Sequence, residues 1–211
     1  MMELSLTLEE HLTRSAILHS KLCPRQVLGV RMARLACTLL GVDPALNRKS
    51  IYVYMETGHC AADGVIVVTG ASPTNGLMRL VGYGKLAATF VYRKSGEAIR
   101  IRERYESREI ATKRMPELSR WEAQLAAYQI MPEHELFRWE SVLIRETLPL
   151  IRPKHSATCQ HCGDRISDHA ERLVDGQTLC QICAGHAYFV STVTPQNAFP
   201  PPPDHPAYSR S

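Results

Sequence analysis

The sequence predicts an α+β fold, with helices packed on a mostly antiparallel sheet, followed by a small zinc-binding domain of the treble-clef type. Segments of helical periodicity alternate with segments rich in β-branched and aromatic residues over the first 150 residues. Two cysteine pairs then occur close together, between residues 159 and 183. We therefore expect a core domain over residues 1–150, a zinc module over residues 154–190, and an extended proline-rich tail over residues 191–211.

The predicted helices of the core begin at recognisable signals. Thr7 followed by Glu10 is a capping-box pattern, which starts a helix. Pro24 suits the first turn of a second helix that continues to Gly41, and this places Cys23 at its amino terminus. Residues 60–69 are expected to form a short buried helix, and the stretches 118–128 and 133–145 are also predicted to be helical.

The predicted strands cover residues 50–56, 86–92 and 98–105. The turn Arg93–Gly96 joins the last two as a hairpin. Arg100, Arg102 and Arg104 alternate with apolar residues along the last strand. Such a face either contacts an anionic ligand or nucleic acid, or is solvated and paired with glutamates such as Glu103 and Glu106.

Composition limits the class of protein. The chain of 211 residues is 45% hydrophobic and 22% charged, which is sufficient for a packed core. Its net charge of +4 is too small to indicate a nucleic-acid partner. The amino terminus is acidic, and no apolar run approaches the roughly 20 residues of a membrane span. We expect a cytoplasmic protein without a membrane partner, whose cysteines are metal ligands, reactive thiols or core residues rather than disulfides.

The carboxy-terminal cysteines have the spacing of a zinc site: Cys159 and Cys162 form one pair, and Cys180 and Cys183 form the other. A hairpin with Asp175-Gly176 at its tip is expected between the pairs, and a helix after the second pair. Knuckle, hairpin and helix together describe a treble clef. The alternative is two redox-active or disulfide pairs, and His161 and His186 are possible substitute ligands.

A second candidate metal site lies in the core. Cys23 and Cys60 each precede a predicted helix, whose amino terminus lowers the pKa of a thiol, and His19 lies four residues before Cys23. One histidine and two cysteines form a three-ligand site with an open position, as in catalytic zinc centres. The alternative is a core histidine with two buried thiols. Cys37, on an apolar helix face, is most simply a core residue.

These same residues carry a family resemblance. HSKLCPRQVLGVRMA (residues 19–33) resembles HGHLCPGLALGYRMA, a motif of the FmdE family of formylmethanofuran dehydrogenase proteins. METGHCAADGVIVVTGAS (residues 55–72) resembles a second family motif, ENDSCAVDAIQVLTGCT. GYGKLAATFVYRKSGEAIRI (residues 82–101) resembles a third, and the match covers about residues 8–150. Many family members also carry a treble-clef zinc finger.

The resemblance implies an α+β protein, commonly dimeric, in which His19, Cys23 and Cys60 line a metal or substrate site near Asp63. Among its departures from the motifs, Lys21 replaces a histidine, Arg25 replaces a glycine, Ala71 replaces a cysteine, and Thr74-Asn75 stands in place of a glycine-lysine pair.

Two functions are therefore expected as alternatives. The first is an FmdE-like metal-binding protein with a His/Cys/Cys site in its core, acting as an accessory subunit or small enzyme of one-carbon or molybdenum-linked redox metabolism; zinc is the expected cofactor of the chain. The second is a non-enzymatic adaptor or regulator, in which the zinc module or the tail docks a protein partner and the core forms a homodimer.

Overall fold

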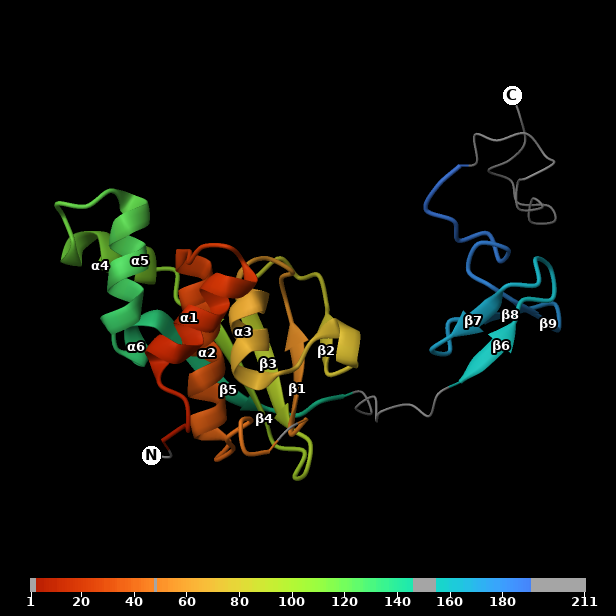
Figure 1. Cartoon of the computed structure of the whole chain (residues 1–211), viewed down its shortest axis with the longest axis horizontal. Helices are drawn as coiled ribbons and strands as arrows, with labels where there is room; N and C mark the ends of the chain where they lie inside the picture. Colours follow the sequence, from red (N-terminus) through yellow and green to blue (C-terminus); the bar gives the residue numbers. More distant parts are fainter. Residues whose placement is uncertain (1–2, 48, 146–154, 191–211) are drawn as a thin grey trace. The chain divides into compact units, whose positions relative to one another are not determined.

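The computed structural model describes residues 3–47, 49–145 and 155–190. The chain divides into two compact units, residues 1–147 and 148–211, which are described separately (Figure 1). The predicted proline-rich tail, residues 191–211, lies outside the described residues.

The first unit contains a five-stranded sheet with the strand order β2-β1-β3-β4-β5. Its strands are β1 (Ile51–Met55), β2 (Met78–Leu80), β3 (Ala87–Tyr92), β4 (Ala98–Glu103) and β5 (Phe137–Val142). Strands β1 and β2 are parallel, and every other pair is antiparallel. The predicted mostly antiparallel sheet is confirmed, and so is the hairpin of β3 and β4.

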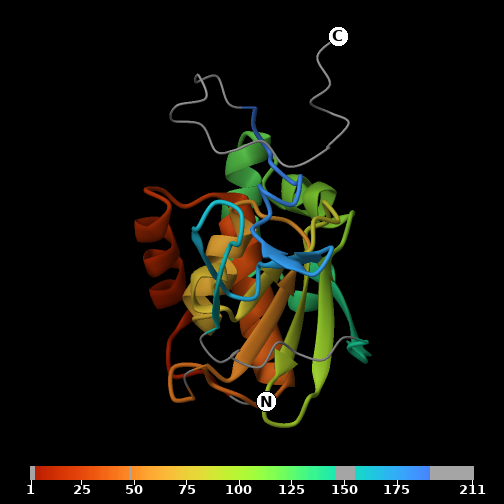
Figure 2. The same ribbon diagram turned by 90° about the vertical axis from the view of Figure 1, so that its right-hand side faces the viewer.

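Helices cover one face of this sheet (Figures 1 and 2). They are α1 (Leu8–Leu18), α2 (Pro24–Leu39) and α3 (Ala61–Thr69). Ile51, Val53 and Met55 of β1 alternate toward this layer and are fully buried. The remaining helical elements are α4 (Ser107–Arg114), α5 (Arg120–Ile130), α6 (Glu133–Leu136) and the short 3-10 turn η1 (Pro73–Asn75).

The helix boundaries follow from local sequence. Thr7 and Glu10 form the predicted capping box, in which the Thr7 hydroxyl accepts from the Glu10 amide and the Glu10 carboxylate accepts from the Thr7 amide. Cys23 is the N-cap residue of α2 and Pro24 its first helical residue, as predicted. Cys60 likewise caps α3. Cys23 and Cys60 therefore both lie at helix amino termini.

A buried arginine joins α2 to the end of α5. Arg31 is 7% exposed, and its guanidinium donates to the backbone carbonyls of Tyr128, Gln129 and Met131 at 2.7–3.0 Å. It also forms an ion pair with Glu133 at 2.8 Å. These bonds satisfy carbonyls that the end of α5 leaves without helical partners, and so fix α5 against α2.

One secondary-structure prediction for the core is wrong. The predicted helix over residues 133–145 ends at Leu136, and β5 follows directly. β5 pairs with the edge of β4, which brings Ile101 opposite Trp139 and Arg100 opposite Glu140. An apolar and a charged cross-strand pair favour the strand over local helix propensity. Helix α4 and the three-residue strand β2 were not predicted.

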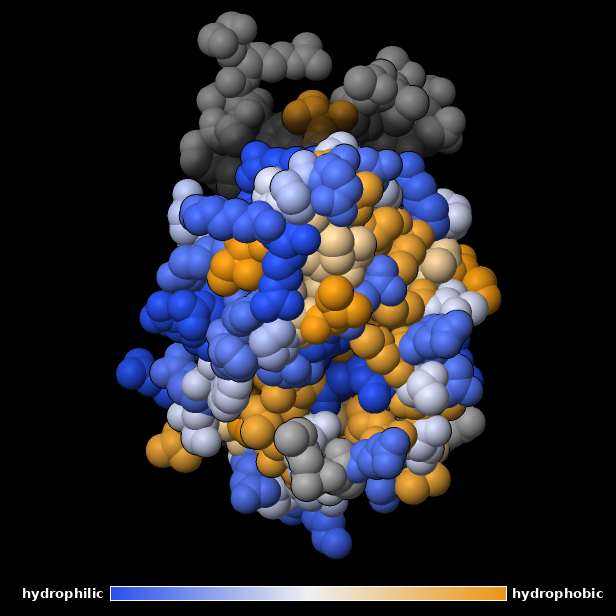
Figure 3. Space-filling view, turned by 90° about the vertical axis from the view of Figure 1, so that its left-hand side faces the viewer, coloured by the Kyte–Doolittle hydropathy of each residue, from blue (hydrophilic) through white to orange (hydrophobic). Residues whose placement is uncertain are grey.

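Figure 3 shows the face of the first unit that carries α4 and α5, where hydrophobic patches stand among hydrophilic residues.

Among the described residues, no helix combines the length and apolar composition needed to cross a bilayer.

The second unit is built from two hairpins. Strands β6 (Ser156–Thr158) and β7 (Arg165–Ser167) form the first, and β8 (Arg172–Val174) and β9 (Gln177–Leu179) the second. Asp175 and Gly176 both have positive φ, 49° and 80°, at the predicted tip. The helix predicted after Cys183 is absent up to Val190, where the described residues end. Turns occupy residues 181–185, and Gly185 at φ 84° interrupts helical geometry.

Candidate metal centres

Two glycines allow α2 and α3 to approach closely enough to bring their amino termini together. A Cβ atom added to Gly29 would lie 2.1 Å from the carbonyl oxygen of Ala61. One added to Gly64 would lie 2.5 Å from the carbonyl oxygen of Gln26. Only glycine is compatible with backbones this close. The close crossing positions the N-cap residue of α2 next to that of α3.

The three predicted core residues lie together. The imidazole of His19 and the thiols of Cys23 and Cys60 each offer one ligand atom, and these atoms all lie within 4.8 Å of one another. The Cys60 Sγ is 3.5 Å from the His19 Nε2. Ligand atoms on a tetrahedral zinc ion are separated by roughly 3.3–3.8 Å, given bonds of about 2.0 Å to nitrogen and 2.3 Å to sulfur. The cluster can close on a metal ion through small side-chain movements.

Asp63 orients the histidine of this cluster. Its Oδ2 is 3.0 Å from the His19 Nδ1. With the Nδ1 proton held by the carboxylate, the Nε2 lone pair faces the two thiols. A carboxylate behind a metal-binding imidazole fixes both its tautomer and its direction. Asp63 reaches this position because it lies in the first turn of α3, three residues after Cys60.

The expectation that a helix amino terminus lowers thiol pKa values is wrong for Cys23. Burial raises the pKa of the Cys23 thiol, and the neighbouring Cys60 raises it further, because two thiolates side by side repel each other. The backbone amides at the start of α2 oppose these effects but do not outweigh them. Cys37 behaves as predicted for a core residue: it is fully buried, and burial raises its pKa to about 12.

The four carboxy-terminal cysteines form a second cluster. Their ligand atoms also lie within 4.8 Å of one another: Cys159, Cys162, Cys180 and Cys183. Leu179 and Ile166 pack with Cys159 and Cys183 to form the small core of this unit. None of the four is in a disulfide. The sulfur of Cys162 is 3.9 Å from that of Cys180, which is a ligand-to-ligand distance rather than a covalent bond.

The electrostatics of this cluster favour a cation. Burial opposes ionisation of Cys159, but backbone amides, including that of Cys180 at 3.3 Å, outweigh burial and lower its pKa to about 6. Burial raises the pKa of Cys162 and that of Cys183. The protein thus stabilises the Cys159 thiolate by its own hydrogen bonds, whereas a divalent ion would favour the thiolate forms of Cys162 and Cys183.

A third group of possible ligands is not arranged for a metal ion. His155, His169 and Glu171 lie near one another on the second unit. The two imidazole rings are stacked at 4.2 Å with an angle of 7° between their planes. Nitrogen lone pairs lie in the ring plane, so parallel rings do not direct them to one point. Glu171 instead pairs with the His155 Nε2 at 3.0 Å.

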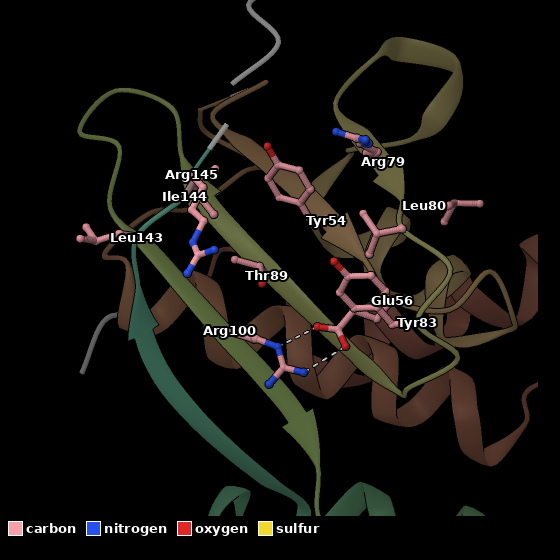
Figure 4. Close-up of a pocket in the computed structure, with 11 residues that line it drawn as sticks. Tyr54, Glu56, Arg79, Leu80, Tyr83, Thr89, Arg100, Leu143, Ile144 and Arg145 are labelled. Carbon is pink, nitrogen blue, oxygen red and sulfur yellow. Dashed lines mark hydrogen bonds and ion pairs between the residues drawn. The ribbon is translucent and has the colours of Figure 1, made fainter. Parts of the chain in front are cut away.

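The arginine-faced strand β4 contributes to a pocket on the sheet face opposite α2 (Figure 4). This pocket has a volume of about 560 Å³. Arg100 forms a bidentate pair with Glu56 at 2.7 and 3.0 Å, and lies 3.6 Å from Glu140. Arg104 pairs with Glu106 at 3.6 Å. For these two arginines the glutamate-paired alternative is the one observed.

Comparison with known proteins agrees with the motifs. Residues 18–148 match the family described as "FmdE, Molybdenum formylmethanofuran dehydrogenase operon". The chain belongs to the FmdE family. The matched region contains His19, Cys23 and Cys60, and ends at residue 148, where the second unit begins.

One curated protein and one solved structure are also similar to this chain. The chain is 32% identical over 206 residues to a probable S-adenosyl-L-methionine-binding protein of Archaeoglobus fulgidus, and the match covers 85% of this chain but 54% of that protein. The chain therefore spans about half the length of this curated relative. The crystal structure of a tungsten formylmethanofuran dehydrogenase FmdE-like protein from Syntrophus aciditrophicus has the same fold. It matches with a TM-score of 0.64 and 19% identity, covering 88% of this chain and 96% of that one.

Proposed function

We propose that this FmdE-family protein binds a divalent transition metal ion, preferably Zn²⁺, in its core through His19, Cys23 and Cys60. The observation that supports this is the convergence of one nitrogen and two sulfur atoms within 4.8 Å, with Asp63 holding the far side of the imidazole. This donor set suits zinc. Three ligands leave one coordination position for water or substrate, where a bound metal acts as a Lewis acid.

The protein's own residues set the properties of this site. Asp63 keeps the proton on the Nδ1 of His19, so that Nε2 stays a lone-pair donor. The Cys23 thiol, whose pKa is raised, releases its proton when a cation is bound, and metal affinity therefore falls at low pH. The glycine contact between α2 and α3 fixes the spacing of the two sulfur atoms.

The second unit is proposed to hold a structural zinc ion through its four cysteines. Four thiolates complete a tetrahedral site and leave no position for substrate. For the protein as a whole, we propose a role as an accessory subunit or a small enzyme of one-carbon or molybdenum-linked redox metabolism, in which the core site takes part. S-adenosylmethionine binding is not part of this proposal, because the relative that bears that name has a large region with no counterpart here.

Metal stoichiometry tests the two sites separately. We expect mass spectrometry of the purified chain to find two metal ions per chain, and Cys60→Ser to retain one. Cys37→Ala is the matched control, because Cys37 belongs to neither cluster and should keep both ions. Two ions in Cys60→Ser would show that the core site is wrong.

An adaptor role is favoured by one observation on the second unit. Leu173, Tyr188 and Val190 are 76%, 96% and 76% exposed, so each could contribute apolar surface to a contact with a partner. A partner protein that is retained by Cys60→Ser but lost from a Leu173→Gln, Tyr188→Ser double variant would support this role. Equal retention by both variants would argue against it.

A further inference from the structure

Three arginines occupy the first turns of three different helices and line the same pocket. Arg25 lies in the first turn of α2, Arg108 in that of α4 and Arg120 in that of α5. Their common pocket has a volume of about 430 Å³. A helix amino terminus carries a partial positive charge, so a cation there is unfavourable by the helix's own electrostatics. Three arginines in first turns around one cavity therefore gather positive charge there, although this position does not favour the stability of their helices.

The single carboxylate that lines the pocket pairs with only one of the three arginines. Glu103 is the one carboxylate that lines it, and both of its oxygens accept from Arg108 at 3.2 Å. Among the described residues, neither Arg25 nor Arg120 forms an ion pair. Glu122, also in the first turn of α5, is held by the Ser119 amide at 3.1 Å as part of a capping box. Two arginines therefore remain available to a ligand.

The rest of the pocket wall is largely apolar. Pro24, Leu28 and Leu86 line it together with Trp121, whose indole is half-exposed. A flat apolar body fits against such a wall, and Trp121 offers a stacking surface. Arginine side chains at the rim match phosphate or carboxylate groups by charge and by bidentate geometry.

The pocket is next to the proposed core metal site. Arg25 follows Cys23 by two residues. A smaller cavity of about 170 Å³ shares Arg25 and Arg108 with the pocket and is also lined by His59 and Ala61, the two neighbours of Cys60. The pocket thus lies beside the proposed metal site, although neither cavity is lined by the two thiols themselves.

We infer that this pocket, lined by Arg25, Arg108 and Arg120, binds a small organic dianion with a flat apolar body. This inference names the class of ligand for the proposed function. It depends on the proposed function only in assuming a metal ion at the neighbouring core site. The negatively charged group binds between Arg25 and Arg120, and the apolar body lies against Trp121 and Leu86.

Isothermal titration of the full chain with 1-naphthyl phosphate at low ionic strength tests the inference. We expect saturable 1:1 binding that weakens at least tenfold in Arg25→Gln and in Arg120→Gln. Arg14→Gln is the matched control, since Arg14 is an exposed arginine of α1 that does not line this pocket, and its affinity should be unchanged. Neutral 1-naphthol should bind at least tenfold more weakly than the phosphate.

The inference is overturned if the wild-type chain does not bind, or if the Arg25 and Arg120 variants bind as tightly as the Arg14 variant. All these arginines are surface residues, and matching thermal unfolding curves would show that the variants are folded. The same titration on Cys60→Ser separates the two proposals. The dianion should still bind there, whereas the core metal is judged independently by metal content.

Discussion

Replacing Gly29 by alanine tests whether the approach of α2 to α3 builds the core metal site. In an ordinary helix this change stabilises by up to about 1 kcal/mol, because alanine has the higher helix propensity. Here the new methyl carbon would meet the Ala61 carbonyl oxygen at 2.1 Å. A carbon and an oxygen in close contact need about 3.3 Å, so the helices must separate by on the order of 1 Å.

That separation sets the expected magnitude. Overpacking of a buried contact costs about 1–3 kcal/mol, which should exceed the propensity gain and give a net loss of about 1–2 kcal/mol. For a unit of this size, we expect a fall in melting temperature of roughly 2–8 °C. Because Cys23 and Cys60 lie at the amino termini of the two helices that separate, the change should also lower the occupancy of the core metal while the four-cysteine site stays loaded.

The assay is thermal unfolding by circular dichroism together with metal analysis of the same samples. Gly58→Ala is the matched control, because its added carbon would meet only the flexible end of Leu80 at 3.4 Å and should change neither reading. A Gly29→Ala protein that is as stable as the wild type and retains two metal ions would refute the reasoning about the helix contact.

Three further changes test other parts of the structure. Arg31→Leu should lower the free energy of unfolding by about 3 kcal/mol or more, because the buried carbonyls of Tyr128 and Met131 lose their hydrogen-bond donor. Urea titrations measure this change, and a loss below about 1 kcal/mol would contradict it. Chelation of the metal should unfold the second unit but not the first. Limited proteolysis in EDTA should then leave a protected fragment close to residues 1–147, and simultaneous digestion of both units would argue against this expectation. The pKa of Cys37 is raised to about 12 in the folded chain from its usual value near 9, so its contribution to stability is complete below pH 9 and should be lost by about 1.4 kcal/mol per pH unit between pH 9 and 12. Urea titrations across pH 8–10.5 should therefore show a steeper decline for wild type than for Cys37→Ala, and parallel declines would disprove the assignment.

Much of the core fold was predictable because its signals are local. The capping box at Thr7, the proline after Cys23 and the alternating residues of β3 and β4 each specify an element without distant partners. Strand β5 was not predictable in this way. Its residues 137–142 follow a helical turn directly, and only pairing with β4 makes them a strand.

The candidate site was predictable in its ligands but not in its surroundings. Spacing and motif identified His19, Cys23 and Cys60. The meeting of Arg25 with Arg108 and Arg120 depends on how three helices separated by many residues pack, which no local pattern specifies. A weak signal was nevertheless present, since each arginine lies in the first turn of a helix, where cations are disfavoured.

With Zn²⁺ bound as proposed, the two clusters would differ in net charge and in open coordination positions, and only the core site would offer a position for chemistry. Four thiolates around Zn²⁺ carry a net charge of about −2 and fill every position, so the second unit repels anions and offers no site for chemistry. Two thiolates and a neutral imidazole leave the core centre uncharged, with an open position but without attraction for an anion. Arg25, which forms no ion pair among the described residues and lies two residues from the proposed ligand Cys23, would supply that attraction. The proposed metal centre and the proposed arginine pocket would therefore be complementary: the pocket would select an anionic ligand beside a centre that has an open coordination position.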